Sequence, residues 1–266
     1  MEEQEFYEII DAYSVEYRNL LKAEFEERLQ NVKLDLSKSG EYEVIWGLVS
    51  RQCSFVNEIS YSPLTWNTVF MPIIMRCMVE NYINLSWILI SPTERSKAFI
   101  KYGLGRETKI LEFAKNKPNK TEVDLDFINQ NESWINQQSF TFLNEINLGG
   151  LKNKEFTDVR KTAQEAKEKE YYDLFYDVCS SATHSTWNYI GKHNLKICEN
   201  PLHKNHRIPI IKEPEIEVHL FLVLAKIMSD TFGKTDGFYK INLTGKSSFE
   251  YLEQSFRNSF QARNAT

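Results

Sequence analysis

The sequence predicts an all-α protein, a single-domain helical bundle. Apolar residues recur at steps of three and four residues through several long segments, which is the period of an amphipathic helix. The 266 residues include only 10 glycines and 7 prolines, too few for the turns of a β-sandwich or barrel. Hydrophobic residues make up 42% of the chain and aromatic residues 13%, which is enough to build a core.

Four helices are predicted in the first half of the chain. The first is acidic, with nine acidic and three basic residues in positions 1–30. Ser-Pro pairs at 62–63 and 91–92 separate the later helices, because proline ends one helix or begins the next. The predicted helices cover residues 2–36, 41–60, 65–90 and 93–116.

The second half alternates between helices and polar connections. Residues 117–150 are rich in Asn, Gln and Ser, so they predict a connection with short helices near 126–134 and 140–146. Residues 195–214 hold three prolines and predict a Pro-containing ordered loop. Further helices are predicted over 156–170, 170–193, 215–232 and 248–262, with a loop or short hairpin over 233–247.

No repeat and no shift in composition divides the chain. We therefore expect one domain over residues 1–266, with an acidic N-terminal helix over 1–40 and a bundle core over 41–262 that carries the polar site. No secretory signal is recognised, and no Cys-x-x-Cys pair is present. Three of the four cysteines lie in apolar helical patterns and are expected to be buried free thiols of a cytoplasmic protein: Cys53, Cys77 and Cys179.

Residues 70–90 are long and apolar enough to cross a membrane. Arg76 and Glu80 interrupt the segment, however, and ionised groups at the bilayer centre cost about 2.5–3.5 kcal/mol each. A buried helix of a soluble bundle explains the segment better, so no membrane association is expected. The net charge of 32 − 37 = −5 gives no support for a protein that coats nucleic acid, although residues 101–120 hold six basic and two acidic residues.

Polar residues recur every four residues on two of the predicted helices, within otherwise apolar patterns. Residues four apart share one face of a helix, so each set forms a stripe. Facing helices of a bundle often build sites from such inward side chains. The stripes consist of Arg76, Glu80 and Asn84 on the first helix and Tyr172, Tyr176, Ser180 and His184 on the second.

Two interpretations of these stripes stay open. In the structural interpretation, Arg76 and Glu80 form a buried ion pair, because a buried charge needs a partner. In the functional interpretation, the two stripes form the floor of a pocket. His184 is then a general acid or base, and Arg76 binds a phosphate or an oxyanion. The catalytic residues would then be Arg76, Glu80 and His184, and the substrate would be positioned by Asn84, Tyr172, Tyr176 and Ser180.

A second polar cluster lies in the predicted loop, as CENPLHKNHR at 198–207. Its Cys-x4-His-x2-His spacing offers zinc ligands, but it fits no common zinc finger and lacks a second cysteine pair, so no metal is predicted. Ordinary loop capping is the plain interpretation. The functional one lays His203, His206 and Arg207 over a phosphate or over the pocket. No phosphate-binding loop or dinucleotide fingerprint is present, and no cofactor is indicated.

Three segments resemble a bacterial family, the domain of unknown function numbered 5677: RCMVENYINLSWIL (76–89), SPTERSKAFIKY (91–102) and YYDLFYDVCSSATHSTWNYI (171–190). The resemblance covers roughly residues 45–215. The family pattern combines an Arg-x3-Glu helix, a Tyr-x3-Tyr-x3-Ser-x3-His helix and a trailing loop. Several members look like stand-alone accessory or defence proteins, so the resemblance implies a role in a bacterial defence or toxin system. The residues that match the pattern are Arg76, Glu80, Tyr172, Tyr176, Ser180 and His184.

A looser likeness is to HEPN proteins, helical bundles that include metal-independent RNases with an Arg followed four to six residues later by His. Here Glu80 follows Arg76, so the two groups would have to come from different helices, Arg76 and His184, and meet across one cleft. This likeness implies an effector enzyme that cleaves a phosphodiester of RNA. The alternative is a non-catalytic interaction module or ligand sensor, with a nucleotide, a protein partner or a second copy bound and the polar stripes as a buried structural network.

Overall fold

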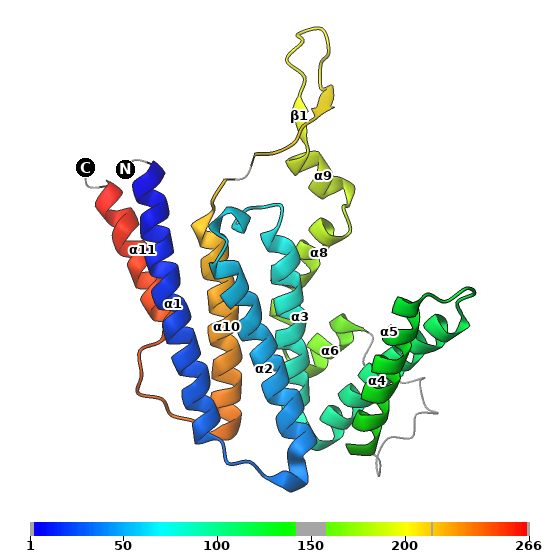
Figure 1. The fold of residues 1–266 in the computed structure, drawn as a ribbon. Helices are drawn as coiled ribbons and strands as arrows, with labels where there is room; N and C mark the ends of the chain where they lie inside the picture. The colour runs from blue at the N-terminus through cyan, green and yellow to red at the C-terminus, as the bar shows by residue number, and fades with distance from the viewer. Residues whose placement is uncertain (1–2, 142–157, 214, 265–266) are drawn as a thin grey trace.

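The computed structural model describes residues 3–141, 158–213 and 215–264, and it confirms the all-α class (Figure 1). Five long helices form the body of the molecule: α1 (Glu3–Asn31), α2 (Ser39–Ser60), α3 (Met71–Ile90), α10 (Val218–Tyr239) and α11 (Ser248–Asn264). Helix α2 packs between α1 and α3, α10 packs on α2 and α3, and α11 returns along α1. The helix predicted over 1–40 is therefore part of the main core.

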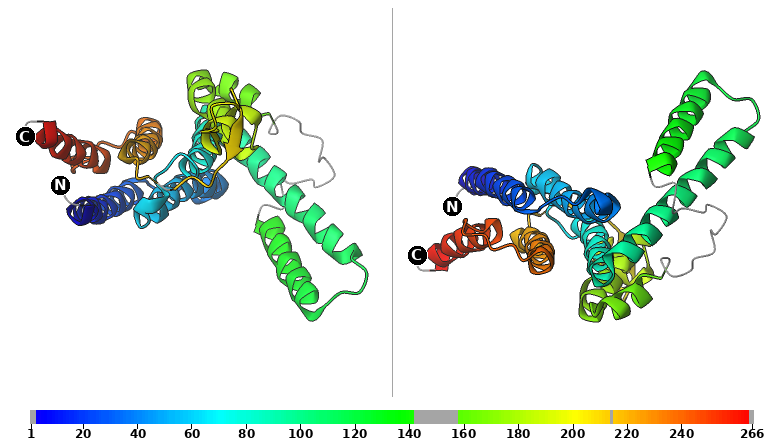
Figure 2. Two further views of the ribbon diagram at one scale, coloured as in Figure 1. Left: turned by 90° about the horizontal axis from the view of Figure 1, so that it is seen from above. Right: turned by 90° about the horizontal axis from the view of Figure 1, so that it is seen from below.

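Helices α4 (Pro92–Asn116) and α5 (Glu122–Thr141) form a hairpin that projects from this body (Figure 2). The hairpin has a small core of its own, built from Leu111, Ile128 and Ile135. Other apolar side chains on it stay in contact with solvent; Phe113 is 81% exposed and Val123 is 77% exposed. The hairpin thus presents apolar surface away from the bundle.

The chain from residue 158 to 213 follows α3 and then leaves the bundle. Helix α6 (Val159–Ala166), the π-helical turn η4 (Tyr172–Tyr176) and helix α8 (Asp177–Thr183) pack on α3. Helix α9 (Trp187–His193) leads into strands β1 (Leu195–Ile197) and β2 (Arg207–Pro209), an antiparallel hairpin that extends beyond the ends of the helices (Figure 1). The remaining short elements are α7 (Lys169–Tyr171) and the 3-10 turns η1 (Leu36–Lys38) and η2 (Pro63–Thr65).

Helix α3 lies at the centre of the core, and 11 of its 20 residues are buried. Its buried Asn81 amide donates hydrogen bonds to the Leu48 carbonyl and to Oε1 of Gln52, both at 2.9 Å. Gln52 in turn donates to the Met78 carbonyl at 3.0 Å and to the Thr231 hydroxyl at 3.2 Å. Because every buried amide needs partners, this network ties α2, α3 and α10 together in one register.

Within the described residues, α3 is the helix that is long and apolar enough to span a membrane. Of its apolar window, 56% is buried inside the protein, against helices that include α2, α6 and α10. Burial on this scale is typical of the core helix of a globular bundle, which is what the sequence predicts for residues 70–90.

A buried ion pair joins α1 to α10. Arg28 is 5% exposed and donates from Nε and Nη2 to the two carboxylate oxygens of Asp236, at 2.9 and 2.8 Å. Glu24 lies 3.6 Å from the guanidinium and accepts a hydrogen bond from the backbone N–H of Ser248, where α11 begins. The guanidinium also lies 3.8 Å above the ring of Phe232. This bidentate geometry compensates the cost of burying the charges and fixes three helices to one another.

Two predicted connections are helical. Residues 122–141 form the continuous helix α5, because packing against α4 stabilises a segment whose polar composition alone predicts a connection. The helix predicted near 140–146 lies mostly outside the described residues. Helix α10 continues to Tyr239, where the sequence predicts a loop from residue 233, because Thr235 and other residues of its last turns are buried.

The helix predicted over 170–193 is interrupted. It widens into η4, and three residues separate the end of α8 at Thr183 from the start of α9 at Trp187. Ser185 adopts a φ of 49°, in the left-handed region, and the backbone N–H of Thr186 donates to the Ser181 carbonyl at 3.1 Å. Ser and Thr side chains compete with helical hydrogen bonds, so the run of polar residues at 183–186 ends a helix that the apolar pattern alone would continue.

The four cysteines are free thiols. Cys179 is buried and Cys53 is half-buried, and desolvation raises the pKa of these thiols to about 11 and about 12. Cys77 is exposed, so the prediction of burial is wrong for this residue. It lies beside Arg76 on the face of α3 that neighbouring helices leave partly open.

Replacing Arg28 by alanine should lower the free energy of unfolding by about 3–5 kcal/mol, because Asp236 and Glu24 lose their cation. Arg257→Ala is the matched control, since its ion pair with Glu253 is exposed and should contribute less than about 1 kcal/mol. Urea denaturation followed by circular dichroism measures both changes. Similar small losses in the two variants would contradict the role assigned to the buried pair.

Candidate functional site

The first predicted stripe lies on the partly open face of α3. Arg76, Glu80 and Asn84 follow one another at four-residue steps, and all three side chains are half-buried. The turn η4 and helix α8 pack against α3, so residues of the second stripe are brought to the first. The structure therefore confirms that the two segments are neighbours.

Arg76 is held by Tyr176. Its Nη2 donates a hydrogen bond to the phenolic oxygen at 2.9 Å, and its Cζ lies 4.7 Å from the centre of the same ring. Tyr176 stacks in turn on Tyr172, with ring centroids 5.1 Å apart and an interplanar angle of 25°. Arg76, Tyr176 and Tyr172 are called the arginine–tyrosine cluster below. A guanidinium held against an aromatic face is stabilised by about 0.5–2 kcal/mol, depending on its desolvation.

Both tyrosines come from the π-helical turn η4. A π-turn adds a residue to the helical turn. Such turns are rare overall, but those that occur often lie at functional sites. Tyr171, just before η4, hydrogen bonds Asp230 on α10, whereas Tyr176 reaches Arg76 on α3. Tyrosines at and just before the π-turn therefore contact two different core helices, α10 and α3.

The Arg76 guanidinium retains donors that no described residue uses. Its Nε is buried without a hydrogen-bond partner in the described part of the chain. A buried donor left unpaired costs about 1–3 kcal/mol, and each such donor in a native protein calls for an explanation. Guanidinium donors match the oxygens of phosphates and carboxylates, so the cluster is suited to an anionic ligand.

Glu80 does not form the ion pair with Arg76 that the structural interpretation expects. Within the described residues, the guanidinium turns to Tyr176 on the neighbouring segment, and its distance to the Glu80 carboxylate exceeds the range of an ion pair. Burial, together with the negative charge of Glu80, raises the pKa of Tyr176, and the hydrogen bond from Arg76 acts in the opposite direction. Glu80 thus lies close enough to influence the cluster electrostatically.

Ser180 and His184 lie further along α8. Ser180 is half-buried, and His184 is exposed at the end of the helix, where its backbone N–H donates to the Ser180 carbonyl at 3.0 Å. A helix rises about 12 Å from residue 176 to residue 184, and a helical tyrosine leans towards the N-terminus, away from His184. His184 is therefore about two helical turns beyond Tyr176, the residue that holds Arg76, and the meeting of Arg76 with His184 across one cleft stays a prediction.

The loop predicted over 195–214 contains the β1–β2 hairpin, which points away from the bundle (Figure 1). Arg207 donates from Nη1 to the Gly191 carbonyl on α9 at 2.6 Å. His203 and His206 are exposed near the tip, beside half-buried Cys198. The expected placement of these three residues over the arginine–tyrosine cluster is not found, because backbone pairing of β1 with β2 carries the loop outward.

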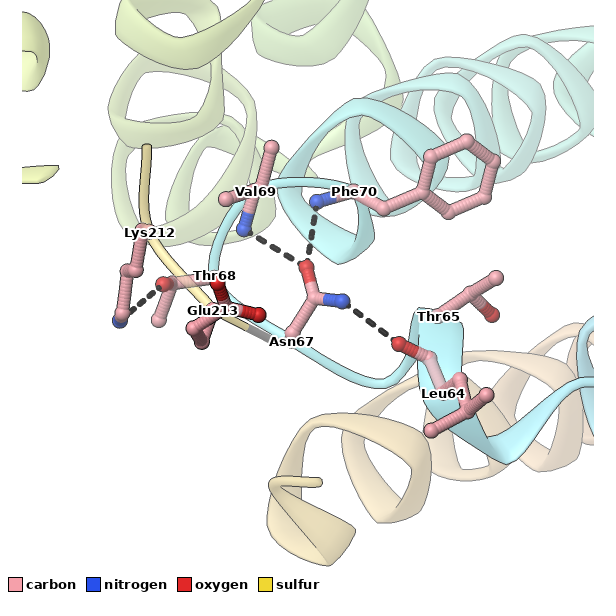
Figure 3. Close-up of a pocket in the computed structure, with 8 residues that line it drawn as sticks. All are labelled: Leu64, Thr65, Asn67, Thr68, Val69, Phe70, Lys212 and Glu213. Atoms are coloured by element: carbon pink, nitrogen blue, oxygen red, sulfur yellow. Dashed lines mark hydrogen bonds between the residues drawn. The ribbon is translucent and has the colours of Figure 1, made fainter. Parts of the chain in front are cut away.

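A pocket of about 280 Å³ lies at the N-terminal end of α3, beside the chain that returns from the hairpin (Figure 3). Asn67 accepts hydrogen bonds from the backbone N–H groups of Val69 and Phe70, both at 3.0 Å. Lys212 donates to the Thr68 hydroxyl at 3.0 Å. These polar groups satisfy one another, and the pocket walls do not include the arginine–tyrosine cluster.

A titratable network that was not predicted joins α3, the short helix α7 and α10. Tyr171 hydrogen bonds Asp230, which also pairs with Lys226, and buried Glu168 pairs with Lys234. The rings of Tyr171 and Tyr82 stack with centroids 4.4 Å apart. The signal was present in the sequence: charged residues recur every four positions on the otherwise apolar helix α10, at Lys226, Asp230 and Lys234.

Comparison with known proteins supports the resemblance seen in the sequence. A family model described as a family of unknown function (DUF5677) matches residues 42–201, which include the arginine–tyrosine cluster, Ser180 and His184. No curated protein and no solved structure matches the chain. The likeness to HEPN proteins stays an expectation of the sequence.

Removing the Tyr176 hydroxyl should destabilise the protein, because Arg76 loses its hydrogen-bond acceptor. We expect Tyr176→Phe to lower the free energy of unfolding by about 1–3 kcal/mol. Tyr172→Phe keeps the stacked ring and should change stability by less than about 0.5 kcal/mol. Thermal melting with calorimetry distinguishes the two, and equal effects would argue against a specific Arg76–Tyr176 contact.

Stability should fall in alkaline solution. Burial raises the pKa of Tyr82, and burial with the hydrogen bond to Asp230 raises the pKa of Tyr171. In the unfolded chain both tyrosines ionise near pH 10, so their contribution is fully present below that pH and is lost as the pH rises above it. Urea unfolding between pH 8 and 11 measures how steeply the free energy of unfolding falls as the pH rises. Each tyrosine can add at most about 1.4 kcal/mol per pH unit to that slope. Tyr171→Phe should make the slope shallower; an unchanged slope would contradict the assignment.

Proposed function

Because the chain belongs to this family of unknown function, its activity has to be argued from its own residues, and we propose that it is an effector enzyme that cleaves RNA without a catalytic metal. The observation that carries the proposal is the half-buried Arg76 guanidinium, which Tyr176 holds in place. A positioned guanidinium of this kind can bind a phosphate oxygen.

The separation of Tyr176 from His184 along the chain favours a polymer over a small ligand. Tyr176, which holds Arg76, and His184 are about two helical turns apart along the chain, so we assign Arg76 and His184 to different phosphates. A polynucleotide carries phosphates at regular intervals and can contact both groups at once. Arg76 then anchors one phosphate, and His184 acts on another.

The surroundings of His184 suit single-stranded RNA. Trp187, three residues beyond it, is 73% exposed and offers a flat surface on which an unpaired base can stack. Residues 184–213 contain five basic and two acidic residues, although the whole chain carries a net charge of −5. A local basic surface beside an exposed aromatic ring is the combination that binds single strands.

The chemistry needs only the groups of the chain and of RNA itself. His184 takes the proton of a ribose 2′-hydroxyl, and the resulting oxygen attacks the neighbouring phosphorus while the bond to the 5′-oxygen breaks. The departing oxygen takes a proton from water, which balances the step. Arg76 holds the chain in register through a neighbouring phosphate, with Tyr176 and Tyr172 stacked beside the guanidinium. Cleavage of cellular RNA would also account for the defence or toxin role that the family resemblance implies.

One observation favours a second function, that of a non-catalytic interaction module. The α4–α5 hairpin exposes Phe113 and Val123, and an apolar groove of about 360 Å³ lies between α2, α4 and α5. Its walls include Val44, Leu48, Phe99 and Trp134. Under this alternative the arginine–tyrosine cluster is purely structural, and a helical partner or a second copy covers the hairpin.

One set of variants distinguishes the two functions. We expect purified protein to cleave a labelled single-stranded RNA with and without EDTA, and His184→Ala to lower the rate by at least about 100-fold, the usual contribution of a general acid or base. Because His184 is exposed, its variant should keep the wild-type melting temperature. His219→Ala is the matched control, since His219 is also exposed but lies on α10.

Arg76→Ala completes the test. Under the enzyme proposal it weakens RNA binding and cleavage together. If instead folded wild-type protein neither binds nor cleaves RNA, and Arg76→Ala only lowers the melting temperature, the enzyme proposal is wrong and the interaction module is favoured. Variants of Arg76 and His184 that cleave as fast as the wild type would reject the assignment of both residues.

A further inference from the structure

The β1–β2 hairpin brings three metal-ligating side chains together. Ile197 pairs with Arg207 in the antiparallel ladder, and the next backbone N–H, that of Cys198, donates to the His206 carbonyl at 2.8 Å. Cys198 and His206 are therefore opposite each other, one residue beyond the paired ends of β1 and β2. The turns that follow bend the chain back: the N–H of His203 donates to the Asn200 carbonyl at 2.9 Å, and that of His206 to the His203 carbonyl at 3.1 Å.

These turns place His203 against the cysteine. Nδ1 of His203 lies 3.7 Å from Sγ of Cys198, and the rings of His203 and His206 meet edge to face with centroids 5.5 Å apart. One ligand atom from each of the three residues lies within 4.8 Å of the other two. Asn205, between the histidines, adopts a φ of 62°, a conformation that asparagine tolerates better than most residues.

We propose that Cys198, His203 and His206 bind one zinc ion. Zn–S and Zn–N bonds of about 2.3 and 2.0 Å in a tetrahedron put a sulfur and a nitrogen about 3.5 Å apart and two nitrogens about 3.3 Å apart. The Cys198–His203 separation of 3.7 Å is close to the first value, and rotation of exposed side chains brings the third ligand within reach. A thiolate with two imidazoles suits zinc, and three protein ligands leave a fourth position for water or for a donor from another molecule.

Among the described residues, only local hydrogen bonds of the turns and the exposed Lys196–Glu199 ion pair hold the tip of the hairpin. Each strand has three residues, and an isolated two-stranded hairpin is marginal in water. The described contacts to the bundle lie at the base, where Arg207 bonds the Gly191 carbonyl and the Ile210 N–H donates to the Asn194 carbonyl at 2.9 Å. Leu202, at the tip, is 88% exposed, so apolar burial contributes little there. A metal ion that cross-links both strands and the turn supplies the missing constraint.

The zinc proposal does not rest on the proposed RNA cleavage, although the hairpin belongs to the basic segment 184–213. The site lies on the hairpin, away from the arginine–tyrosine cluster on α3, and it requires only that the hairpin ligands lose their protons. Thiol and imidazolium groups must deprotonate to bind the ion, so affinity should decrease as the pH is lowered.

Titration of the full-length, chelator-treated protein with Co²⁺ tests the proposal directly. We expect one equivalent of Co²⁺ per chain, a thiolate-to-cobalt charge-transfer band in the near ultraviolet and the visible bands of tetrahedral cobalt. Zn²⁺ added afterwards should displace Co²⁺ and abolish these bands. Absence of the charge-transfer band, or a band from an octahedral site, would overturn the proposal.

Matched variants locate the ion. Cys198→Ser should abolish the charge-transfer band, and His203→Ala and His206→Ala should each weaken Zn²⁺ binding by at least about 100-fold, beyond the 10–100-fold typical of losing an outer-shell partner. Cys77→Ser and His219→Ala remove an exposed thiol and an exposed imidazole elsewhere and should bind as the wild type does. Circular dichroism confirms folding, and limited proteolysis should show zinc-dependent protection of residues 198–207 in the wild type alone. Binding that survives in the three hairpin variants, or is lost in the controls, would contradict the site.

Discussion

Helix α3 is apolar on nearly every side, and the arrangement of the rest of the molecule follows from the need to cover it. Helices α2, α6, α8 and α10 and the turn η4 pack around it. Its buried Asn81 amide finds partners in the network with Gln52. Where the cover is incomplete, α3 carries Arg76 and Glu80, and η4 turns a tyrosine towards the guanidinium. The candidate site is thus the part of α3 that the neighbouring helices cover only partly.

The sequence predicts the elements whose stability comes from one apolar face. Helices α2, α4 and α11 and most of α1 and α3 follow from a period of three to four residues. The pattern fails where contacts distant in sequence decide the outcome. Polar α5 is helical because α4 supports it, and the helix ending at Thr183 stops because Ser185 and Thr186 form local turns. The convergence of Cys198 with His206 depends on strand register and that with His203 on the turns between them, and ligand spacing along the chain reveals neither.

The same distinction applies to the polar stripes. Four-residue spacing predicts correctly that Arg76, Glu80 and Asn84 share a face and that residues 172–180 lie against it. It cannot predict the π-turn, which directs Tyr171 to Asp230 and Tyr176 to Arg76. Nor does the spacing predict that the helix ends just before His184 and that the His184 side chain is exposed. The resulting separation of His184 from Tyr176, which holds Arg76, is what favours a ligand with repeated phosphates.

The account depends on the Arg76 guanidinium being available to a phosphate while Tyr176 holds it. Nuclear magnetic resonance of the arginine Nε–H groups, with the Arg76 signal assigned by its loss in Arg76→Lys, measures this without requiring turnover. On addition of a short single-stranded RNA to the His184→Ala protein, we predict a saturable shift of the Arg76 signal that is larger than that of Arg28 in the core. An Arg76 signal that stays unchanged at saturating RNA, or equal shifts at both arginines, would contradict it.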